Sequence, residues 1–241
     1  MIIFLTSSPS GPLNVPNDNH LLDEQNKFVE HLKMYCANNC KGLIIAAFPN
    51  NYNQNDEMLK FFQDAFNHTD LSIYLEIFDE RKKQLDLNKY KFIMLAGGHV
   101  PTQNAYFHKI QLKEHLKNFD GVIMTVSAGT MNSATNVYAQ PELEGESAST
   151  FNRHLEGLGL TNLNILPHYQ MVKDYYLDGK RLFEDITYPN SYKNKFVCLL
   201  DGSYVLIKDQ QTLLFGEAYL IKDGKICILN TKNNIIDLSN F

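Results

Sequence analysis

The 241-residue sequence contains no tryptophan, only four cysteines and no excess of basic residues. A net charge of −5, with lysines and arginines scattered along the chain, argues against a nucleic-acid surface. Its apolar runs fall short of the roughly 20 residues that a membrane-spanning helix needs. The N-terminal Met1–Thr6 lacks the basic start and the length of a signal peptide. We therefore expect a cytoplasmic protein that binds neither nucleic acid nor a membrane.

Patterns that bind metals or separate domains are also missing. Cys36 and Cys40 are not followed by a histidine or cysteine pair at zinc-site spacing, and no His-Glu-x-x-His motif occurs. Neither a Pro/Gly/Ser-rich linker nor an internal repeat interrupts the chain. We expect residues 1–241 to form a single α/β domain with no metal and no cofactor. The oligomeric state stays open, a homodimer included.

Five short segments are apolar throughout, which is typical of strands in a parallel sheet that is covered on both faces. They are Ile2–Thr6, Gly42–Phe48, Ser72–Phe78, Phe92–Ala96 and Gly121–Val126. Amphipathic segments between them predict helices, which are Asp23–Tyr35, Asp56–Phe66 and Tyr106–Phe119. Alternating strands and helices predict a doubly wound, mostly parallel sheet flanked by helices.

The last part of the chain has a different pattern. Short apolar runs there predict five more strands, which are Phe196–Leu200, Tyr204–Lys208, Thr212–Phe215, Ala218–Lys222 and Lys225–Leu229. Asp-Gly pairs at 201–202 and 223–224 are strong hairpin signals. We therefore expect C-terminal antiparallel hairpins that form a meander at the edge of the sheet.

One buried strand runs directly into a cluster of small residues, Ser127-Ala128-Gly129. A helix is expected to follow over Met131–Tyr138, so Ser127 would lie on a tight turn at the carboxyl edge of the sheet, where α/β proteins bind their ligands. There its Oγ would be exposed as a nucleophile. The alternative is that Ser127 simply caps the helix, as serine often does.

A second strand ends in a pair of glycines, Gly97-Gly98. If this strand neighbours the one before Ser127, the backbone N–H groups of Gly98 and Ala128 can form an oxyanion hole. The alternative is an ordinary turn built on two glycines.

A serine nucleophile also needs a general base. Of the eight histidines, His168 follows a short apolar run and is predicted at a strand end, whereas His154 is predicted in a polar helix over Phe151–Gly157. His168 is our candidate base, and His99, next to the glycine pair, is the competitor. A structural role for His168 is the remaining alternative.

The stretches Leu95-Ala96-Gly97-Gly98, Val126-Ser127-Ala128-Gly129 and Pro167-His168-Tyr169 resemble the dipeptidase E and cyanophycinase family of serine peptidases, in order and spacing. The resemblance implies a fold similar to class I glutamine amidotransferases. It implies Ser127 as nucleophile, His168 as general base and then acid, and an oxyanion hole from Gly98 and Ala128. The acidic third member of the triad would be Glu142, with Glu144 as a near alternative.

The resemblance also implies a substrate-binding cation. Arg181 lies where relatives carry an arginine and is expected to bind a substrate carboxylate, with Arg153 as a weaker alternative. The sequence departs from the family pattern at His99, where asparagine is common, and at Thr125, where the turn usually has glycine. We expect both at the mouth of the site, with His99 contacting substrate.

These features predict a serine peptidase that cleaves small peptides through an acyl-enzyme. An amidotransferase-like enzyme is the first alternative, although such enzymes carry cysteine where this chain has Ser127. The second alternative is a catalytically inactive binding module on the same fold.

Overall fold

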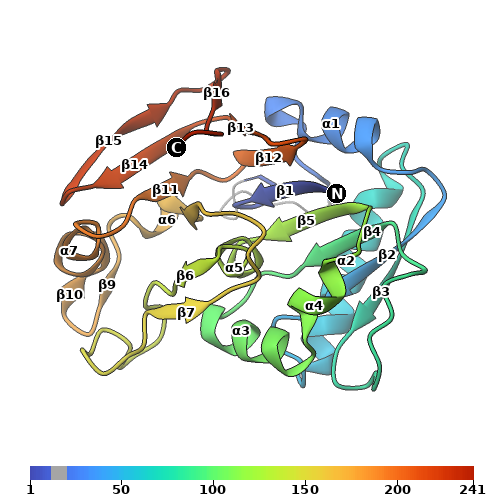
Figure 1. Ribbon diagram of the computed structural model, residues 1–241, viewed down its shortest axis with the longest axis horizontal. Coiled ribbons are helices and arrows are strands. Elements are labelled where there is room, and N and C mark those ends of the chain that lie inside the picture. The colour runs from blue at the N-terminus through green and yellow to red at the C-terminus, as the bar shows by residue number, and fades with distance from the viewer. Residues whose placement is uncertain (12–20) are drawn as a thin grey trace.

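A computed structural model describes residues 1–11 and 21–241 of the chain and contains one large β-sheet (Figure 1). Its strands are β1 (Ile2–Thr6), β2 (Cys40–Ile45), β3 (Ile73–Phe78), β4 (Phe92–Leu95), β5 (Val122–Val126), β12 (Tyr204–Lys208), β13 (Gln211–Phe215) and β16 (Ile235–Asp237). They lie in the order β16-β13-β12-β1-β5-β4-β2-β3. The strands β1 to β5 are parallel to their neighbours among themselves, and β12, β13 and β16 extend the sheet in antiparallel fashion. The predicted mostly parallel sheet is confirmed.

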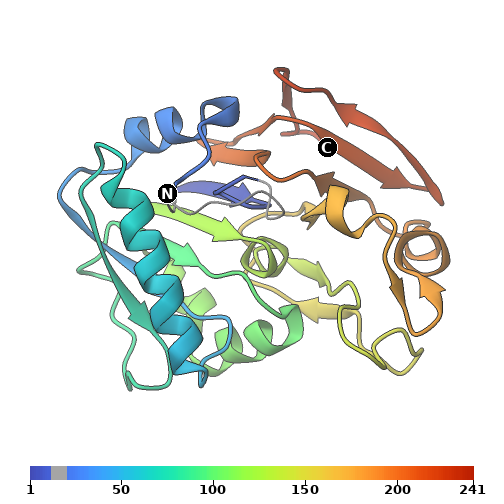
Figure 2. The same ribbon diagram turned by 180° about the vertical axis from the view of Figure 1, so that it is seen from behind.

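Helices cover both faces of this sheet. The helices of the described chain are α1 (Phe28–Tyr35), α2 (Tyr52–Asn67), α3 (Val100–Lys109), α4 (Leu112–Leu116), α5 (Ala128–Asn132), α6 (Tyr169–Val172) and α7 (Tyr188–Asn190), with short helical turns at Gln25–Lys27 and Leu182–Thr187. Of these, α1 to α4 pack on the large sheet, whereas α6 and α7 pack with β11 and β14 in a third core. Because successive strand residues point to opposite faces, Phe4 and Met94 pack in one core with α1 and α2, and Leu5 and Leu95 pack in the other with α3 and α4. Figure 2 shows α2 lying across the face opposite to α3 and α4.

A second, four-stranded sheet contains β8 (Asn164–Leu166), β11 (Phe196–Leu199), β14 (Ala218–Lys222) and β15 (Lys225–Asn230). The order is β15-β14-β11-β8, and β11 is parallel to β8. Two small ribbons accompany it, β6 (Asn136–Tyr138) with β7 (His154–Glu156), and β9 (Tyr176–Leu177) with β10 (Lys180–Arg181). The five late strands therefore exist as predicted, but the single meander was wrong, because β12 and β13 join the large sheet and β11, β14 and β15 join the small one.

Tertiary contacts shorten or replace several predicted helices. The segment Tyr106–Phe119 belongs to two helices, α3 and α4, because Gln111 between them adopts a left-handed conformation at φ 52°. The predicted helices over Met131–Tyr138 and Phe151–Gly157 were wrong, because residues 136–138 and 154–156 pair with each other as the strands β6 and β7. Asp23–Tyr35 becomes a regular helix only from Phe28.

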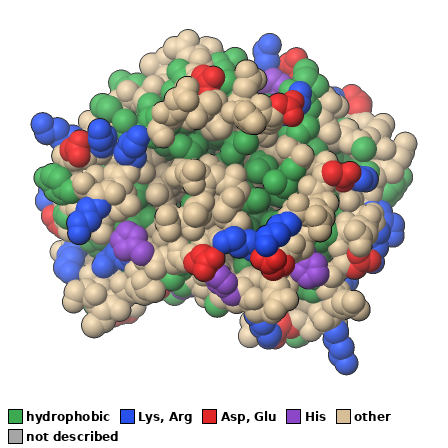
Figure 3. All heavy atoms as spheres, viewed as in Figure 1, with side chains coloured by type: hydrophobic (Ala, Val, Ile, Leu, Met, Phe, Trp, Pro, Cys, Tyr) green, Lys and Arg blue, Asp and Glu red, His purple; other side chains and the backbone are tan. Residues whose placement is uncertain are grey.

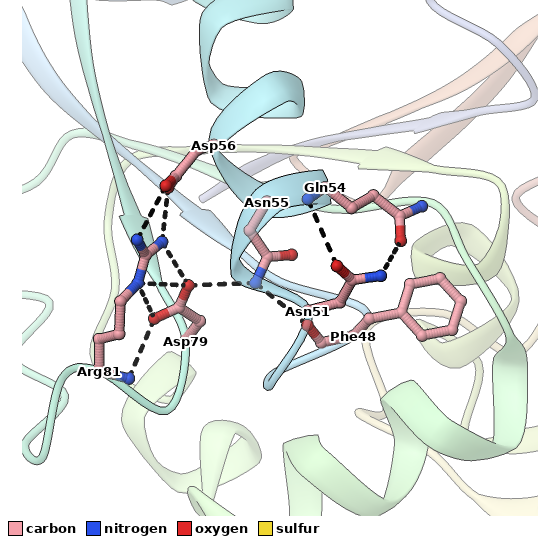
Figure 4. Close-up of polar contacts among 7 residues, drawn as sticks. All are labelled: Phe48, Asn51, Gln54, Asn55, Asp56, Asp79 and Arg81. Atoms are coloured by element: carbon pink, nitrogen blue, oxygen red, sulfur yellow. Dashed lines mark hydrogen bonds and ion pairs between the residues drawn. The ribbon is translucent and has the colours of Figure 1, made fainter.

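At the carboxyl ends of β2 and β3, an ionic cluster fastens two loops to the start of α2 (Figure 4). Arg81 donates to the buried carboxylate of Asp79 and, at 2.6 Å, to Oδ1 of Asp56. Nδ2 of Asn55 donates both to Asp79 Oδ2, at 3.1 Å, and to the carbonyl of Phe48, at 3.0 Å. Burial alone would raise the pKa of Asp79, but the bonds from Arg81 and Asn55 hold it below its usual range. The Phe48 loop is therefore fixed beside the sheet edge.

The surface of the described chain carries mixed charge. On the face in Figure 3, cationic and anionic side chains lie interspersed, with hydrophobic side chains between them. Among the described residues, no helix has the length and apolar character that crossing a membrane would require.

Candidate active site

Ser127 follows β5 on a strained turn. Its backbone angles are φ 49° and ψ −109°, and a positive φ is uncommon for any residue other than glycine. Its N–H donates to the carbonyl of Thr6 at 3.2 Å, and its carbonyl accepts the N–H of Met131 at 3.1 Å. These bonds to β1 and α5 hold the turn in place. This strand–turn–helix geometry is the one that exposes a nucleophilic serine at the top of a sheet.

Thr125 lies behind this turn rather than at the mouth of the site. Its side chain is fully buried, and its Oγ1 lies 2.6 Å from Oγ1 of Thr130. Thr130 in turn donates to the carbonyl of Thr6, whose own hydroxyl donates to the carbonyl of Thr125, both at 2.6 Å. Our expectation that Thr125 lies at the mouth was wrong, because its hydroxyl belongs to a buried network that joins β1, β5 and α5.

The glycine pair lies beside Ser127, because β4 and β5 are neighbouring parallel strands. A Cβ added to Gly97 would lie 3.4 Å from Cβ of Ser127. A Cβ on Gly98 would lie 2.5 Å from Cβ of Ala47, a distance that leaves room only for glycine. The condition for an oxyanion hole from Gly98 and Ala128, that their strands are adjacent, is therefore met.

Three buried side-chain amides join the glycine loop to the helix that follows Ser127. Nε2 of Gln103 donates to the carbonyl of Ala96 at 2.7 Å. Nδ2 of Asn132 donates to Oε1 of Gln103 at 3.0 Å and to the carbonyl of Val100 at 3.1 Å. Nδ2 of Asn104 donates to Oδ1 of Asn132 at 3.1 Å. This amide network fixes the two segments that carry Gly98 and Ala128 relative to each other.

Asn132→Ala should therefore weaken both stability and catalysis. The change leaves Oε1 of Gln103, Nδ2 of Asn104 and the Val100 carbonyl short of partners, and each unsatisfied buried group costs about 1–3 kcal/mol. We expect a loss of about 2–4 kcal/mol in the free energy of unfolding and a fall in kcat of about tenfold or more with a smaller change in KM. Urea unfolding and steady-state kinetics measure these, with the exposed Asn88→Ala as control. An unchanged kcat would contradict a positioning role for the network.

His168 and a carboxylate that the sequence did not reveal, Asp201, face each other at the ends of two parallel strands. Leu166 of β8 lies opposite Cys198 of β11, so the residues just beyond both strands come together at one edge. Nδ1 of His168 lies 2.7 Å from Oδ1 of Asp201. A carboxylate in this position holds the ring and stabilises its protonated form, leaving Nε2 for proton transfer.

Asp201 is buried and held from several directions. Ser7 Oγ donates to its Oδ1 at 2.7 Å, and Gln170 Nε2 donates to its Oδ2 at 2.5 Å. Ser7 Oγ also accepts the backbone N–H of His168 at 2.7 Å. Burial alone would raise the pKa of Asp201, but the bond and charge of His168 and the bonds from Ser7 and Gln170 hold it below its usual range. The carboxylate therefore stays ionised at neutral pH.

Glu142 lies in the same region, but the carboxylate bonded to His168 is that of Asp201. The backbone N–H of Glu142 donates to Oε2 of Glu146 at 2.9 Å. Glu142 is an exposed residue that lines the pocket. Desolvation of its carboxylate by the surrounding protein, together with the negative charge of Glu146, raises the pKa of Glu142 to about 7. Glu144, the near alternative, is exposed.

Ser127 and His168 line one pocket of about 260 Å³. Its other lining residues are Met131, Gln140, Pro141, Glu142, Pro167, Val172, Tyr175 and Leu182. This volume is slightly below the roughly 300–1,000 Å³ of pockets that bind drug-sized ligands. The pocket therefore suits a ligand of one or two amino-acid residues.

His99 and Arg181, the two residues predicted to bind substrate, are bonded to other side chains of the protein. His99 lies between Thr102 Oγ1, at 2.8 Å from Nδ1, and Glu146 Oε1, at 2.8 Å from Nε2. Arg181 is paired with Asp185 at 2.8 Å on the exposed β10. A substrate contact by either residue stays a prediction, and neither lines the pocket of Ser127 among the described residues.

Comparison with known proteins agrees with this geometry. The family model of peptidase family S51 matches residues 22–215. The chain belongs to peptidase family S51. It is therefore a peptidase, as the sequence predicted, and the predicted membership of the dipeptidase E family of serine peptidases is confirmed. No curated protein matches the chain.

Two solved structures of peptidases share the fold of this S51 member. A peptidase from an acI-B1 actinobacterium superposes with a TM-score of 0.68 at 13% identity, covering 98% of this chain and 96% of the other. A protein assigned as a peptidase E from Listeria monocytogenes EGD-e gives a TM-score of 0.58 at 16% identity, covering 88% and 96%. At these identities, the likeness establishes the fold.

Proposed function

We propose that this S51 peptidase cleaves small peptides with Ser127 as nucleophile, His168 as general base and Asp201 as the carboxylate that orients His168. One observation carries the proposal. His168, with Nδ1 bonded to a buried carboxylate, lines the same pocket as a serine on a strained turn. Asp201 takes the role that we first expected of Glu142, because a triad needs the carboxylate at the far ring nitrogen of the base.

In the first half of the reaction, Ser127 Oγ attacks the peptide carbonyl carbon while Nε2 of His168 takes the hydroxyl proton. The oxyanion that forms accepts hydrogen bonds from the backbone N–H groups of Gly98 and Ala128. The C–N bond then breaks, and His168 returns its proton to the leaving nitrogen. The products are a free amine and an acyl-enzyme ester on Ser127.

In the second half, His168 takes a proton from water, whose oxygen attacks the ester carbonyl. The bond to Oγ breaks, His168 protonates Oγ, and the carboxylic acid leaves. The pocket volume supports a dipeptide or a similarly short peptide as substrate. The four cysteines are free thiols, which supports action in a reducing compartment such as the cytoplasm.

A serine-directed fluorophosphonate tests whether Ser127 is activated. We expect covalent labelling of the native protein, a loss of labelling in Ser127→Ala, and slow labelling in His168→Ala, because the probe reacts with a serine only when a base assists it. Mass spectrometry of the labelled peptide locates the adduct. Absence of labelling in the native protein would favour the binding module instead.

A further inference from the structure

A second cavity, of about 650 Å³, shares no lining residue with the Ser127 pocket. Phe78 and Leu85 line it from the end of β3 and the loop that follows, and Tyr106 and Ile110 line it from α3 and the turn after it. We call it the β3–α3 pocket; β3 is the edge strand of the large sheet, and α3 and α4 lie on one face of that sheet (Figure 1). Its volume falls within the roughly 300–1,000 Å³ that is typical of small-molecule sites.

The β3–α3 pocket has an aromatic wall. The rings of Phe78 and Tyr106 are stacked, with centroids 6.5 Å apart and an angle of 26° between their planes. Both side chains are 4% exposed, so the protein holds them in fixed positions. Leu85, which is buried, and Ile110, which is half-buried, extend the apolar surface. An aromatic or aliphatic group can therefore pack against this wall.

The hydroxyl of Tyr106 is buried and has no hydrogen-bond partner among the described residues. Because a buried polar group without a partner is costly, an acceptor supplied by a ligand would be favourable there. Burial and the charges of Asp79 and Glu80 raise the pKa of Tyr106, so the hydroxyl stays protonated at neutral pH. Tyr106 is therefore a hydrogen-bond donor in search of an acceptor.

Lysines dominate the charged lining of the β3–α3 pocket. Lys82, Lys83 and Lys109 line it, against the single carboxylate of Glu80. Lys109 Nζ donates to Glu80 Oε1 at 2.6 Å, so these two charges balance each other. Arg81, in the same loop, is outside the lining and is already held by two aspartates. The charges left to face a ligand are those of Lys82 and Lys83.

These two lysines are incompletely balanced by the protein. Lys82 Nζ donates to Glu76 Oε2 at 3.0 Å, but Glu76 also accepts from Lys41 at 3.4 Å, so one carboxylate serves two cations. Lys83 is exposed and makes no ion pair within the described part of the chain. In a protein with a net charge of −5, this is a local excess of positive charge. Such an excess attracts an anion.

We propose that the β3–α3 pocket is a second ligand site, which takes a small carboxylic acid with an aromatic or aliphatic body. The body packs on Phe78 and Tyr106, and the carboxylate meets Lys83 and the hydroxyl of Tyr106. A single carboxylate matches the small surplus of positive charge. The inference does not depend on the proposed catalytic triad, because no residue of the triad lines this pocket.

Isothermal titration calorimetry with 1-naphthylacetate tests the site, and 1-naphthylacetamide is the matched probe of the same shape without the charge. We expect a Kd of about 1 mM or below for the acid and binding of the amide that is weaker by about tenfold or more, since the amide lacks charge-assisted hydrogen bonds. Raising NaCl from about 0.05 M to about 0.5 M should weaken binding of the acid several-fold, because salt screens exposed charges. No binding of the acid, or equal binding of acid and amide, would overturn the inference.

Lys83→Gln locates the anion within the pocket. The variant should weaken binding of the acid about fivefold or more and leave binding of the amide unchanged. Lys232→Gln is the control, because Lys232 is an exposed lysine next to β16, at the opposite edge of the large sheet from β3. If Lys232→Gln weakens binding as much as Lys83→Gln does, the acid is attracted by charge in general and the pocket is not its site.

Tyr106→Phe removes only the hydroxyl. The Tm of the free protein should be retained or raised, because no bond within the chain is lost, while binding of the acid should weaken about threefold or more. A lower Tm with unchanged binding would show that the hydroxyl has a partner inside the protein, and would contradict the part assigned to Tyr106.

Ser127→Ala distinguishes the two pockets. The variant should bind 1-naphthylacetate as tightly as the native protein, and saturating acid should not block fluorophosphonate labelling of native Ser127, because the pockets share no lining residue. Loss of acid binding in Ser127→Ala would place the acid in the Ser127 pocket and overturn the inference. Absence of labelling together with intact binding of the acid would contradict the proposed function and leave the second site standing.

Discussion

Ser127→Ala should lower kcat/KM, for whichever dipeptide is cleaved fastest, by about four to six orders of magnitude, because removing the nucleophile of a triad leaves only the residual contribution of binding and the oxyanion hole. KM should change little, since alanine removes one oxygen atom from a pocket whose walls stay in place. Thermal stability should be retained, because the bonds of the turn run through the backbone of Ser127. Exposed Ser149→Ala is the control for a serine outside the site.

If Ser127→Ala retained activity close to that of the native enzyme, Ser127 would not be the nucleophile. A loss of activity that came with a large drop in Tm would point to a structural role instead. Measuring Tm and kcat/KM on the same preparation separates these two results.

Asp201→Asn should lower kcat by about 10³–10⁴-fold, because an asparagine amide can hold the ring of His168 in the wrong tautomer and cannot stabilise its positive charge. The effect should fall on kcat more than on KM, since Asp201 lies behind His168 and outside the pocket lining. Its pKa is held below the usual range by the bonds from His168, Ser7 and Gln170, so the carboxylate stays ionised at neutral pH. The loss should therefore be present across the whole neutral range.

The matched comparison is with Glu142→Gln, the residue that we expected in this role from sequence. A large loss of kcat in Asp201→Asn and a small one in Glu142→Gln supports Asp201 as the orienting carboxylate. A small loss of kcat in Asp201→Asn and a large one in Glu142→Gln would contradict the role of Asp201 and support Glu142 as the third member of the triad. The pH profile of kcat in both variants is a second readout, because loss of the orienting carboxylate should change it and loss of a merely nearby carboxylate should not.

Strand positions were predictable because burial and apolar runs are local properties of the sequence. The five parallel strands and the five late strands all appear, most within one or two residues of the expected bounds. Pairing was not predictable in the same way. The Asp-Gly turn at 201–202 signalled a reversal of the chain but could not say that the chain there passes from the small sheet to the large one.

Asp201 was missed because its role depends on strand pairing, which the local sequence does not reveal. In the sequence it is half of an Asp-Gly pair, and a turn alone accounts for that pair. Its position just beyond a buried strand was the available signal, since the carboxyl ends of parallel strands gather the functional residues of such sheets. The helix predicted over Met131–Tyr138 was wrong because Asn132 belongs to the buried amide network and the strand β6 begins at Asn136. These are tertiary contacts, which the spacing of apolar residues along the sequence does not reveal.

The bond between Ser7 and Asp201 spans 194 residues of chain, and that between Ser7 and His168 spans 161. During synthesis, the turn with Ser127 emerges long before Asp201, and β12 pairs with β1 only after both have left the ribosome. In the proposed triad, the carboxylate of Asp201 therefore joins the site through contacts between distant parts of the chain, and such contacts form slowly during folding. If the proposed triad is right, a chain that ends before Asp201 has Ser127 without an oriented base, and proteolytic activity is expected only after the first and last thirds of the chain have packed together.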